Sequence, residues 1–247
     1  MSDGIFAALS GAVAQERALE TVANNVANVG TTGFRGDRLA FREAMSRASG
    51  GPTPTSLRYV EVDRSEVDMT EGPVRQTGNP LDLALSGQGF FVVRTPAGDR
   101  LTRDGGFMVS PDGVLTSQAG HAVLDAEPAD PRRPEIRIPA GTSSLSVASD
   151  GTLSSGEQVF GRIRVMDAPP GSVRHEGHSL LAPVEGTTLA PAAQFSVLQG
   201  YLEGANVSAV QGMNELISAN RSFDAFQRVI QAFRDIDNRT ARELAAQ

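Results

Sequence analysis

Apolar residues recur at helical spacing throughout residues 206–247. They step by threes and fours along one face, at Leu216, Ala219, Phe223, Phe226, Ile230, Phe233 and Leu244. A second set widens this face into a stripe, namely Val210, Met213, Ile217, Val229 and Ile236. The pattern predicts an amphipathic helix that begins at a capping box of Ser208 and Gln211. At about 1.5 Å per residue, residues 208–245 would form a helix on the order of 55 Å long, which is typical of a coiled coil or a bundle.

A second amphipathic helix is predicted over residues 3–29. Its apolar positions keep heptad spacing at Ile5, Ala8, Ala12, Leu19, Val22, Val26 and Val29, and Leu9 broadens the stripe. Asn24, Asn25 and Asn28 lower the helix propensity toward the end, and Gly30 ends the helix. These asparagines have two interpretations that the sequence leaves equal: termination of the helix, or hydrogen bonding across an assembly.

The middle of the chain changes its period from helical to two. Residues 46–56 have the Gly, Pro, Ser and Thr composition of a linker, and short alternating runs follow, separated by turns. The expected fold class is α+β: long N- and C-terminal amphipathic helices form a coiled-coil-like pair, with a central all-β insert domain. The predicted segments are 1–45 (N-terminal helix and motif), 46–76 (linker and extended segment), 77–205 (central β-rich domain) and 206–247 (long C-terminal helix).

Composition narrows the classes of function. The formal net charge of −7 argues against nucleic-acid binding by bulk electrostatics. The absence of cysteine excludes a disulfide framework and thiolate chemistry. No stretch is long and apolar enough to span a membrane, so no membrane insertion is expected. The first arginine is Arg17, so a cleaved secretory signal with a basic start is not expected either.

Candidate catalytic or metal chemistry is sparse. The sequence His175-Glu176-Gly177-His178 is a cluster with metal-ligand residue types, but it lacks the helical spacing of a zincin and an evident third ligand. We interpret it as a solvated loop. We expect no catalytic residues, no metal and no cofactor. The alternative from a different class is a β-domain enzyme or binding module that acts on cell-wall glycan, which would need convergent carboxylates in a cleft.

Two long motifs at the ends of the chain carry a family resemblance. Residues 24–35 read Asn-Asn-Val-Ala-Asn-Val-Gly-Thr-Thr-Gly-Phe-Arg, and residues 199–207 read Gln-Gly-Tyr-Leu-Glu-Gly-Ala-Asn-Val. They resemble the terminal motifs of flagellar basal-body rod and hook proteins. Residues 78–91, followed by Thr102-Arg103-Asp104-Gly105, are similar to the central signature of the same family.

The resemblance implies a structural subunit that self-assembles through its terminal helices into a tubular drive shaft. The proximal-rod branch of the family is the most similar, with the distal-rod branch or another axial protein as the alternative. The implied partners are copies of the chain itself, other rod proteins, hook–basal-body components and the flagellar type III export apparatus. The implied location is the basal body, in the rod that spans the periplasm, after export without a cleaved signal.

The expected assembly interface follows from stripes that are wider than two isolated helices can bury. Its residues are Ile5, Leu9, Leu19, Val22, Val26, Val29, Leu216, Phe223, Phe226, Ile230 and Phe233. The expected motif and turn residues are Asn24, Asn25, Asn28, Thr32, Gly33, Phe34, Gly204 and Asn206. Gly33 is expected to need a positive φ where the chain leaves the first helix.

Overall fold

The computed structural model describes residues 2–47, 56–142, 144–177 and 179–245. The chain forms two compact units. The first, here called the helical unit, comprises Met1–Ala27, Asp37–Ser65 and Ser208–Gln247. The second, here called the β body, comprises Asn28–Gly36 and Glu66–Val207. Each unit is described by itself.

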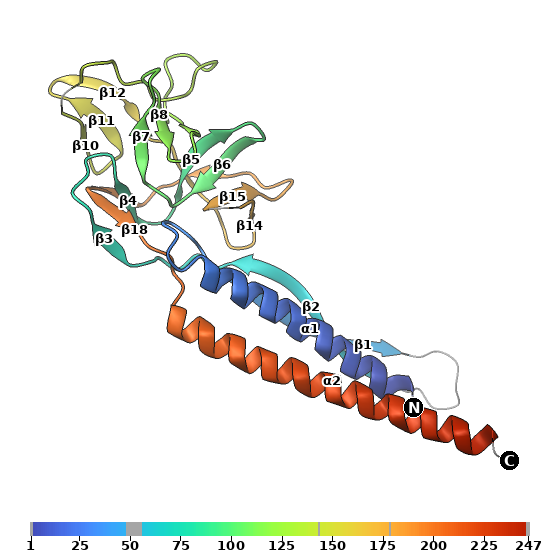
Figure 1. Ribbon diagram of the computed structural model, residues 1–247. Helices are drawn as coiled ribbons and strands as arrows, with labels where there is room; N and C mark the ends of the chain where they lie inside the picture. The colour runs from blue at the N-terminus through green and yellow to red at the C-terminus, as the bar shows by residue number, and fades with distance from the viewer. Residues whose placement is uncertain (1, 48–55, 143, 178, 246–247) are drawn as a thin grey trace. The chain divides into compact units, whose positions relative to one another are not determined.

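Two long helices dominate the helical unit. Helix α1 is Ser2–Ala27 and helix α2 is Ala209–Ala245, and they lie side by side (Figure 1). Strands β1 (Asp37–Arg47) and β2 (Ser56–Val67) pair as a two-stranded sheet, and β1 contacts α1. No described helix combines the length and the apolar character that crossing a membrane requires.

The predicted cap of the C-terminal helix forms only in part. The Gln211 amide donates to Ser208 Oγ at 3.5 Å, as a capping box requires. The Gln211 side chain, however, donates from Nε2 to Glu215 Oε1 at 3.0 Å one turn further along. The cap therefore depends on the serine hydroxyl, and the glutamine contributes to the helix surface instead.

The β body is built around a nine-stranded sheet. Seven strands follow one path in the order β14 (Val173–His175), β15 (Leu180–Pro183), β6 (Gly98–Thr102), β5 (Phe90–Thr95), β9 (Ala122–Val123), β8 (Leu115–Ser117) and β7 (Phe107–Val109). Strand β13 (Val165–Asp167) pairs with β5 and with β16 (Ala190–Pro191). All of these pairs are antiparallel, so short turns can join strands that neighbour in sequence.

Three smaller sheets complete the β body. One contains β10 (Ser146–Val147), β11 (Thr152–Ser155) and β12 (Gln158–Arg162); the others pair β17 (Phe195–Gln199) with β4 (Leu83–Gly87), and β18 (Tyr201–Glu203) with β3 (Val74–Gln76). The last two sheets join strands from near the end of the β body's sequence to strands from near its start. The β body is therefore closed by its final segment.

Strand β5 shows how the core is divided. Its residues Phe90 to Val93 are all buried, although neighbouring side chains of a strand point to opposite faces. Phe91 and Val93 enter one apolar cluster, and Phe90 and Val92 enter another. In the first cluster the Phe91 and Phe107 rings meet edge to face, with centroids 5.2 Å apart. Both faces of the central strand are covered, which explains its uninterrupted apolar run.

The predicted fold class is wrong in its description of a central all-β insert. Both terminal helices are present, but most of the described chain is a large β-rich body with a nine-stranded sheet, and strands begin as early as Asp37, within the helical unit. Residues Asn28–Gly36, which follow α1, lie in the β body. The reason is long-range pairing: the Gly33 amide donates to Glu203 O at 2.8 Å, and the Asp68 amide donates to Gly36 O at 2.7 Å. Local periodicity carries no information about such partners.

Candidate assembly site and motif cluster

The two helices of the helical unit pack antiparallel. Phe233 lies against Gly4, Phe226 against Gly11 and Gly212 against Val26, so residue numbers rise in α1 as they fall in α2. Small residues on one helix thus receive large side chains from the other. Val26 of α1 and Phe226 and Phe233 of α2 belong to the predicted heptad positions, whereas the three glycines do not.

Three of the predicted interface residues, Val26, Phe226 and Phe233, make these contacts. The predicted residues that are half-buried on the two helices are Ile5, Leu19, Val22, Val26, Leu216, Phe223, Phe226, Ile230 and Phe233. Leu9 lies elsewhere on α1 and is 50 % exposed. Val29 follows the end of α1 and is half-buried within the β body. Val26, Phe226 and Phe233 therefore help to hold α1 against α2 of the same chain.

A second group of apolar side chains on the helices stays exposed. It comprises Phe6, Leu9 and Val13 on α1, and Val210, Met213, Ile217, Val229 and Ile236 on α2; we call it the outer apolar set. Phe6 is 60 % exposed and Val210 is 72 % exposed. Phe6 and Val13 were missed as candidates, although their spacing from Leu9, three and four residues, was a signal in the sequence.

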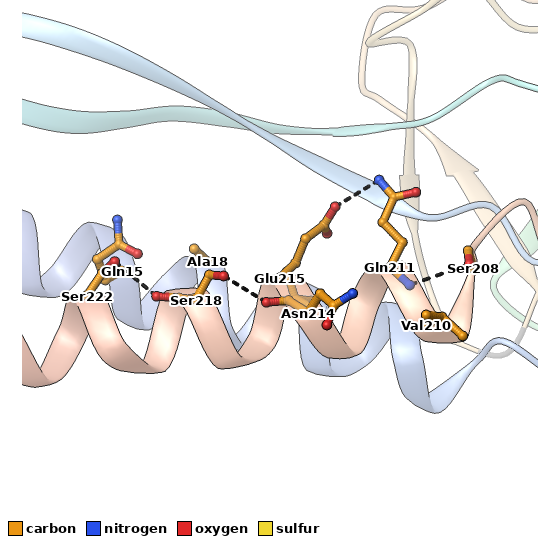
Figure 2. Close-up of a pocket in the computed structure, with 11 residues that line it drawn as sticks. Gln15, Ala18, Ser208, Val210, Gln211, Asn214, Glu215, Ser218 and Ser222 are labelled. Carbon is orange, nitrogen blue, oxygen red and sulfur yellow. Dashed lines mark hydrogen bonds between the residues drawn. The ribbon is translucent and has the colours of Figure 1, made fainter.

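A shallow hollow of about 650 Å³ lies between the two helices near the start of α2 (Figure 2). Ala18 and Val22 of α1 line it, together with Ser218, Ala219 and Ser222 of α2. Both serine hydroxyls form hydrogen bonds within α2: Ser218 donates to Asn214 O at 2.9 Å and Ser222 donates to Ser218 O at 3.0 Å (Figure 2). The serine hydroxyls are thus satisfied within α2, and longer polar side chains, among them Gln15 and Glu215, also line the hollow.

The asparagines near the end of α1 have different environments. Asn25 forms a two-bond clamp on Asp37, because its Nδ2 donates to Asp37 O and its Oδ1 accepts from Asp37 N, both at 2.9 Å. Asn28 accepts from Thr31 Oγ1 at 3.2 Å in the turn that follows the helix. Asn24 is exposed on α1. Asn25 and Asn28 thus both bond within the chain, which supports the termination interpretation for these two residues.

Three motifs that lie far apart in sequence meet in a buried ionic cluster inside the β body. Glu203 lies between two arginines: Arg35 Nη2 is 2.8 Å from its Oε1, and Arg103 Nη1 is 3.1 Å from its Oε2. All three side chains are almost completely buried. The contact between Arg35 Nη2 and Glu203 is an ion pair and not a hydrogen bond, and Nη2 donates no other hydrogen bond within the described residues. The sequence did not predict this cluster as a site, because each of its three residues is a single charged position within a separate motif.

Backbone groups complete the cluster. The Gly72 amide donates to Glu203 Oε1 at 2.8 Å, and Arg103 donates to Leu85 O at 3.1 Å and to Gly87 O at 2.6 Å. Burial lowers the pKa of the Arg35 guanidinium, and the neighbouring Glu203 carboxylate opposes that shift. An arginine nevertheless stays protonated in proteins, so the cluster holds two positive charges around one central carboxylate.

The turn after α1 is fixed against this cluster. Gly33 has φ of 65°, which confirms the predicted positive φ. A Cβ on Gly33 would lie 2.1 Å from the Asp104 amide nitrogen and 2.2 Å from the Arg103 carbonyl carbon. Both space and backbone conformation therefore require glycine at this position.

The neighbours of Gly33 make specific contacts. Thr32 Oγ1 donates to Asp104 Oδ1 at 2.9 Å. Phe34 is buried, and its ring stacks on His175 with centroids 5.3 Å apart. The interpretation of His175 as a loop residue is wrong, since it lies in β14, while His178 lies outside the described residues. Among the described residues, no group of three or more acidic, His or Cys side chains is arranged to hold a metal ion.

The C-terminal motif residues tie the start and the end of the β body together. Asn206 Oδ1 accepts from the Gly36 amide at 2.7 Å, and its Nδ2 donates to the carbonyls of Asp68 and Thr70, both at 3.0 Å. The Gly204 amide donates to Pro73 O at 2.8 Å. The predicted motif residues Thr32, Gly33, Phe34, Gly204 and Asn206 are thus brought together in one unit.

Replacing Asp104 by asparagine is expected to stabilise the protein at neutral pH, by on the order of 1 kcal/mol. Burial raises the pKa of the Asp104 carboxyl, and hydrogen bonds from the Gly106 amide and Thr32 oppose this shift. The stability that this group contributes is therefore present at low pH and lost as the pH rises through its folded-state pKa. Asparagine keeps the accepting oxygen and removes the charge. Urea unfolding at pH 7 and pH 4 should show a gain at pH 7 that shrinks at pH 4.

The matched control is Asp150→Asn. Two hydrogen bonds donated by Thr152 lower the pKa of the exposed Asp150 carboxyl, so neutralising it should be slightly destabilising at pH 7. A loss of stability at pH 7 for Asp104→Asn would show that the carboxylate is better solvated than its burial indicates.

Family models and known relatives match this chain along most of its length. A model described as "Flagella basal body rod protein" matches residues 5–35, one described as "Flagellar hook protein FlgE/F/G D1 domain" matches residues 84–155, and one described as "Flagellar basal body rod FlgEFG protein C-terminal" matches residues 198–243. The first and last include the two terminal motifs that meet around Glu203.

Relatives named as rod proteins are similar over nearly the whole chain. Flagellar basal-body rod protein FlgF of Rhizobium meliloti is 32% identical over 226 residues, covering 91% of this chain and 90% of the relative. FlgF of Caulobacter vibrioides is 32% identical over 234 residues, covering 93% of each. Flagellar basal-body rod protein FlgG of Agrobacterium fabrum is 30% identical over 251 residues, covering 90% and 92%. The chain belongs to the family of flagellar basal-body rod proteins, and it is a structural rod subunit of the flagellar basal body.

Proposed function

We propose that the chain is an FlgF-type subunit of the proximal rod, which packs against copies of itself and against other axial proteins. The observation that carries the proposal is the outer apolar set on the helical unit. After α1 and α2 have packed together, apolar side chains on both helices remain exposed, including Phe6, Val210 and Met213. Exposed apolar surface of this kind marks an interaction site. A head-to-tail interface that does not close into a ring generates a helical tube.

The assembly interface proposed here has two layers. The predicted residues on the α1–α2 contact face hold the helical unit together, while the outer apolar set, with Leu9 as the predicted member, meets neighbouring subunits. The same proposal includes the predicted segment boundaries at residues 45, 76 and 205. In it, the terminal segments are the ones that assemble with other subunits.

The proposal also includes export through the flagellar type III apparatus without a cleaved signal, into a rod that spans the periplasm. A chain without cysteine suits such a route because no thiol can be oxidised during passage. Nucleic-acid binding, membrane insertion, a cofactor and catalysis are not part of the proposed role. A net charge of −7 agrees with the first of these exclusions.

FlgG or another axial role is the alternative within the family, favoured by the FlgG relative at 30% identity. An enzyme or binding module acting on cell-wall glycan is the alternative from another class. Glycoside hydrolysis normally needs two carboxyl groups across a site. A hollow of about 440 Å³ in the β body contains one carboxyl group, that of Asp112, among the residues that line it. This supports the structural role.

Replacing Phe226 by aspartate is expected to abolish swimming in a strain whose own copy of the gene has been deleted. The ring packs over Gly11, and an unpaired carboxylate placed in this half-buried contact costs on the order of 2 kcal/mol or more. Basal bodies purified from the complemented strain should lack the variant chain and a complete rod. The neighbouring exposed residue provides the matched control, since Gln227→Asp should restore swimming and filament growth.

Two results would contradict the proposal. One is normal swimming by the deletion strain, because a proximal-rod subunit is indispensable for a continuous drive shaft. The other is a complete rod built from the Phe226→Asp chain. Location of the wild-type chain in the distal rather than the proximal rod, measured by imaging of purified basal bodies, would favour the FlgG-type alternative.

A further inference from the structure

Two glycines of α1 stand directly opposite two phenylalanines of α2. A Cβ on Gly11 would lie 2.4 Å from Phe226 Cε1, and a Cβ on Gly4 would lie 2.7 Å from Phe233 Cζ. Real Cβ atoms essentially never approach another heavy atom so closely. Each glycine therefore forms a notch that its ring occupies, and alanine, one methyl group larger, does not fit without displacement of the ring.

The two notches repeat at the same interval as the two rings. Gly4 and Gly11 are seven residues apart, and so are Phe226 and Phe233. If α2 slid by seven residues along α1, only one ring would find a glycine. If it slid by three residues, Phe223 could face Gly11, but Ile230 would then face Gly4, so again only one glycine would receive a ring. If it slid by four, neither glycine would. A third glycine, Gly212, lies against Val26 of α1. This glycine belongs to α2 rather than to α1, and its contact forms in the same register.

We propose that the Gly4–Phe233 and Gly11–Phe226 notches fix the register of the α1–α2 pair and determine which helix α1 accepts. A helix that pairs with α1 must present two aromatic side chains seven residues apart. The α2 helix of this chain does so. A helix from another axial protein without such a pair leaves the notches empty, and empty notches forfeit packing contacts.

The register has a consequence for assembly, and this step rests on the proposed function. With the notches filled, Phe6, Leu9 and Val13 of α1 and Met213 and Ile217 of α2 remain exposed. A register shift would place these side chains at different heights relative to one another. The notches therefore determine the pattern of apolar side chains that a neighbouring subunit meets.

The register can be measured on the purified full-length chain, because its lack of cysteine allows introduced thiols to report it without interference. Gln15 and Ser222 line the same hollow between the helices. The pair Gln15→Cys and Ser222→Cys should cross-link efficiently with a short bifunctional thiol reagent. The pair Gln15→Cys and Val229→Cys reports a slip of seven residues and should cross-link poorly.

Adding Gly11→Ala to the first pair should lower its cross-linking rate by about tenfold or more, since overpacking displaces the Phe226 ring. In a helix without this contact the same substitution would favour the helical state, because alanine has the higher helix propensity. Phe226→Leu, added to Gly11→Ala, should restore most of the cross-linking by making room for the methyl group. The control Gly30→Ala should have no effect, because a Cβ there would meet nothing within 4 Å.

An unchanged cross-linking rate in the Gly11→Ala chain would overturn the proposal. A reduced rate that Phe226→Leu fails to restore would also overturn it, because Gly11 would then act through something other than the ring. Because these rates are measured on isolated protein, they are independent of swimming. The register could therefore prove correct even if the chain were absent from the proximal rod.

Discussion

Replacing Glu203 by glutamine is expected to destabilise the protein by about 3–5 kcal/mol, the usual loss when one partner of a buried ion pair is removed. Glu203 is the carboxylate between Arg35 and Arg103, and all three side chains are buried. Glutamine has nearly the same shape but removes the carboxylate that lies between the two guanidinium groups, and it turns an –NH₂ group toward one of them. Urea unfolding at pH 7 should show a lower midpoint, with the largest effect on signals from the β body.

The matched control is Glu176→Gln. Glu176 also pairs with an arginine, Arg100, but at the surface of the same unit. Exposed ion pairs contribute about 0–1 kcal/mol, so this substitution should leave the unfolding midpoint almost unchanged. Equal losses of stability in the two glutamine variants would show that burial is not the reason why the Glu203 cluster stabilises the protein.

Replacing Gly33 by valine is expected to disrupt the turn between α1 and the β body, and to prevent the motif residues from meeting. The backbone at Gly33 has φ of 65°, a conformation that costs a β-branched residue on the order of 1–3 kcal/mol. The added Cβ would also lie 2.1 Å from the Asp104 amide nitrogen. A backbone atom cannot rotate away as a side chain can, so the total loss should exceed the strain alone. The hydrogen bond from the Gly33 amide to Glu203 O should then be lost as well.

The measurement is again urea unfolding of the full chain, together with amide exchange at Gly33 and its neighbours. Gly30→Val supplies the control three residues earlier, where φ is not in the positive range and a Cβ would meet nothing within 4 Å. Equal stability of the Gly33 and Gly30 variants would show that the turn can rearrange at little cost. In that case the motif around Gly33 would have to act in assembly rather than in folding.

The sequence by itself determined the two helices and several local features. Heptad spacing identified both helices because the side chains that define it lie within one or two turns of one another. The positive φ at Gly33 and the cap at Ser208 followed from local chemistry in the same way. The family resemblance also depended on contiguous motifs. In each case the residues that carry the signal are neighbours along the chain.

The tertiary structure alone decided how these elements are used. Residues Asp37–Arg47 form a strand because β2 supplies backbone partners, which the local sequence does not reveal. Arg103 finds its carboxylate 100 positions further along, in Glu203. Heptad spacing likewise predicted an apolar face on α1 and on α2 but not which surface covers it. From the sequence, the side chains that pack the two helices together therefore could not be distinguished from those that stay exposed for a neighbouring subunit. Pairing between distant segments has no local signature in a single sequence, because its free energy depends on which surfaces the whole chain brings into contact.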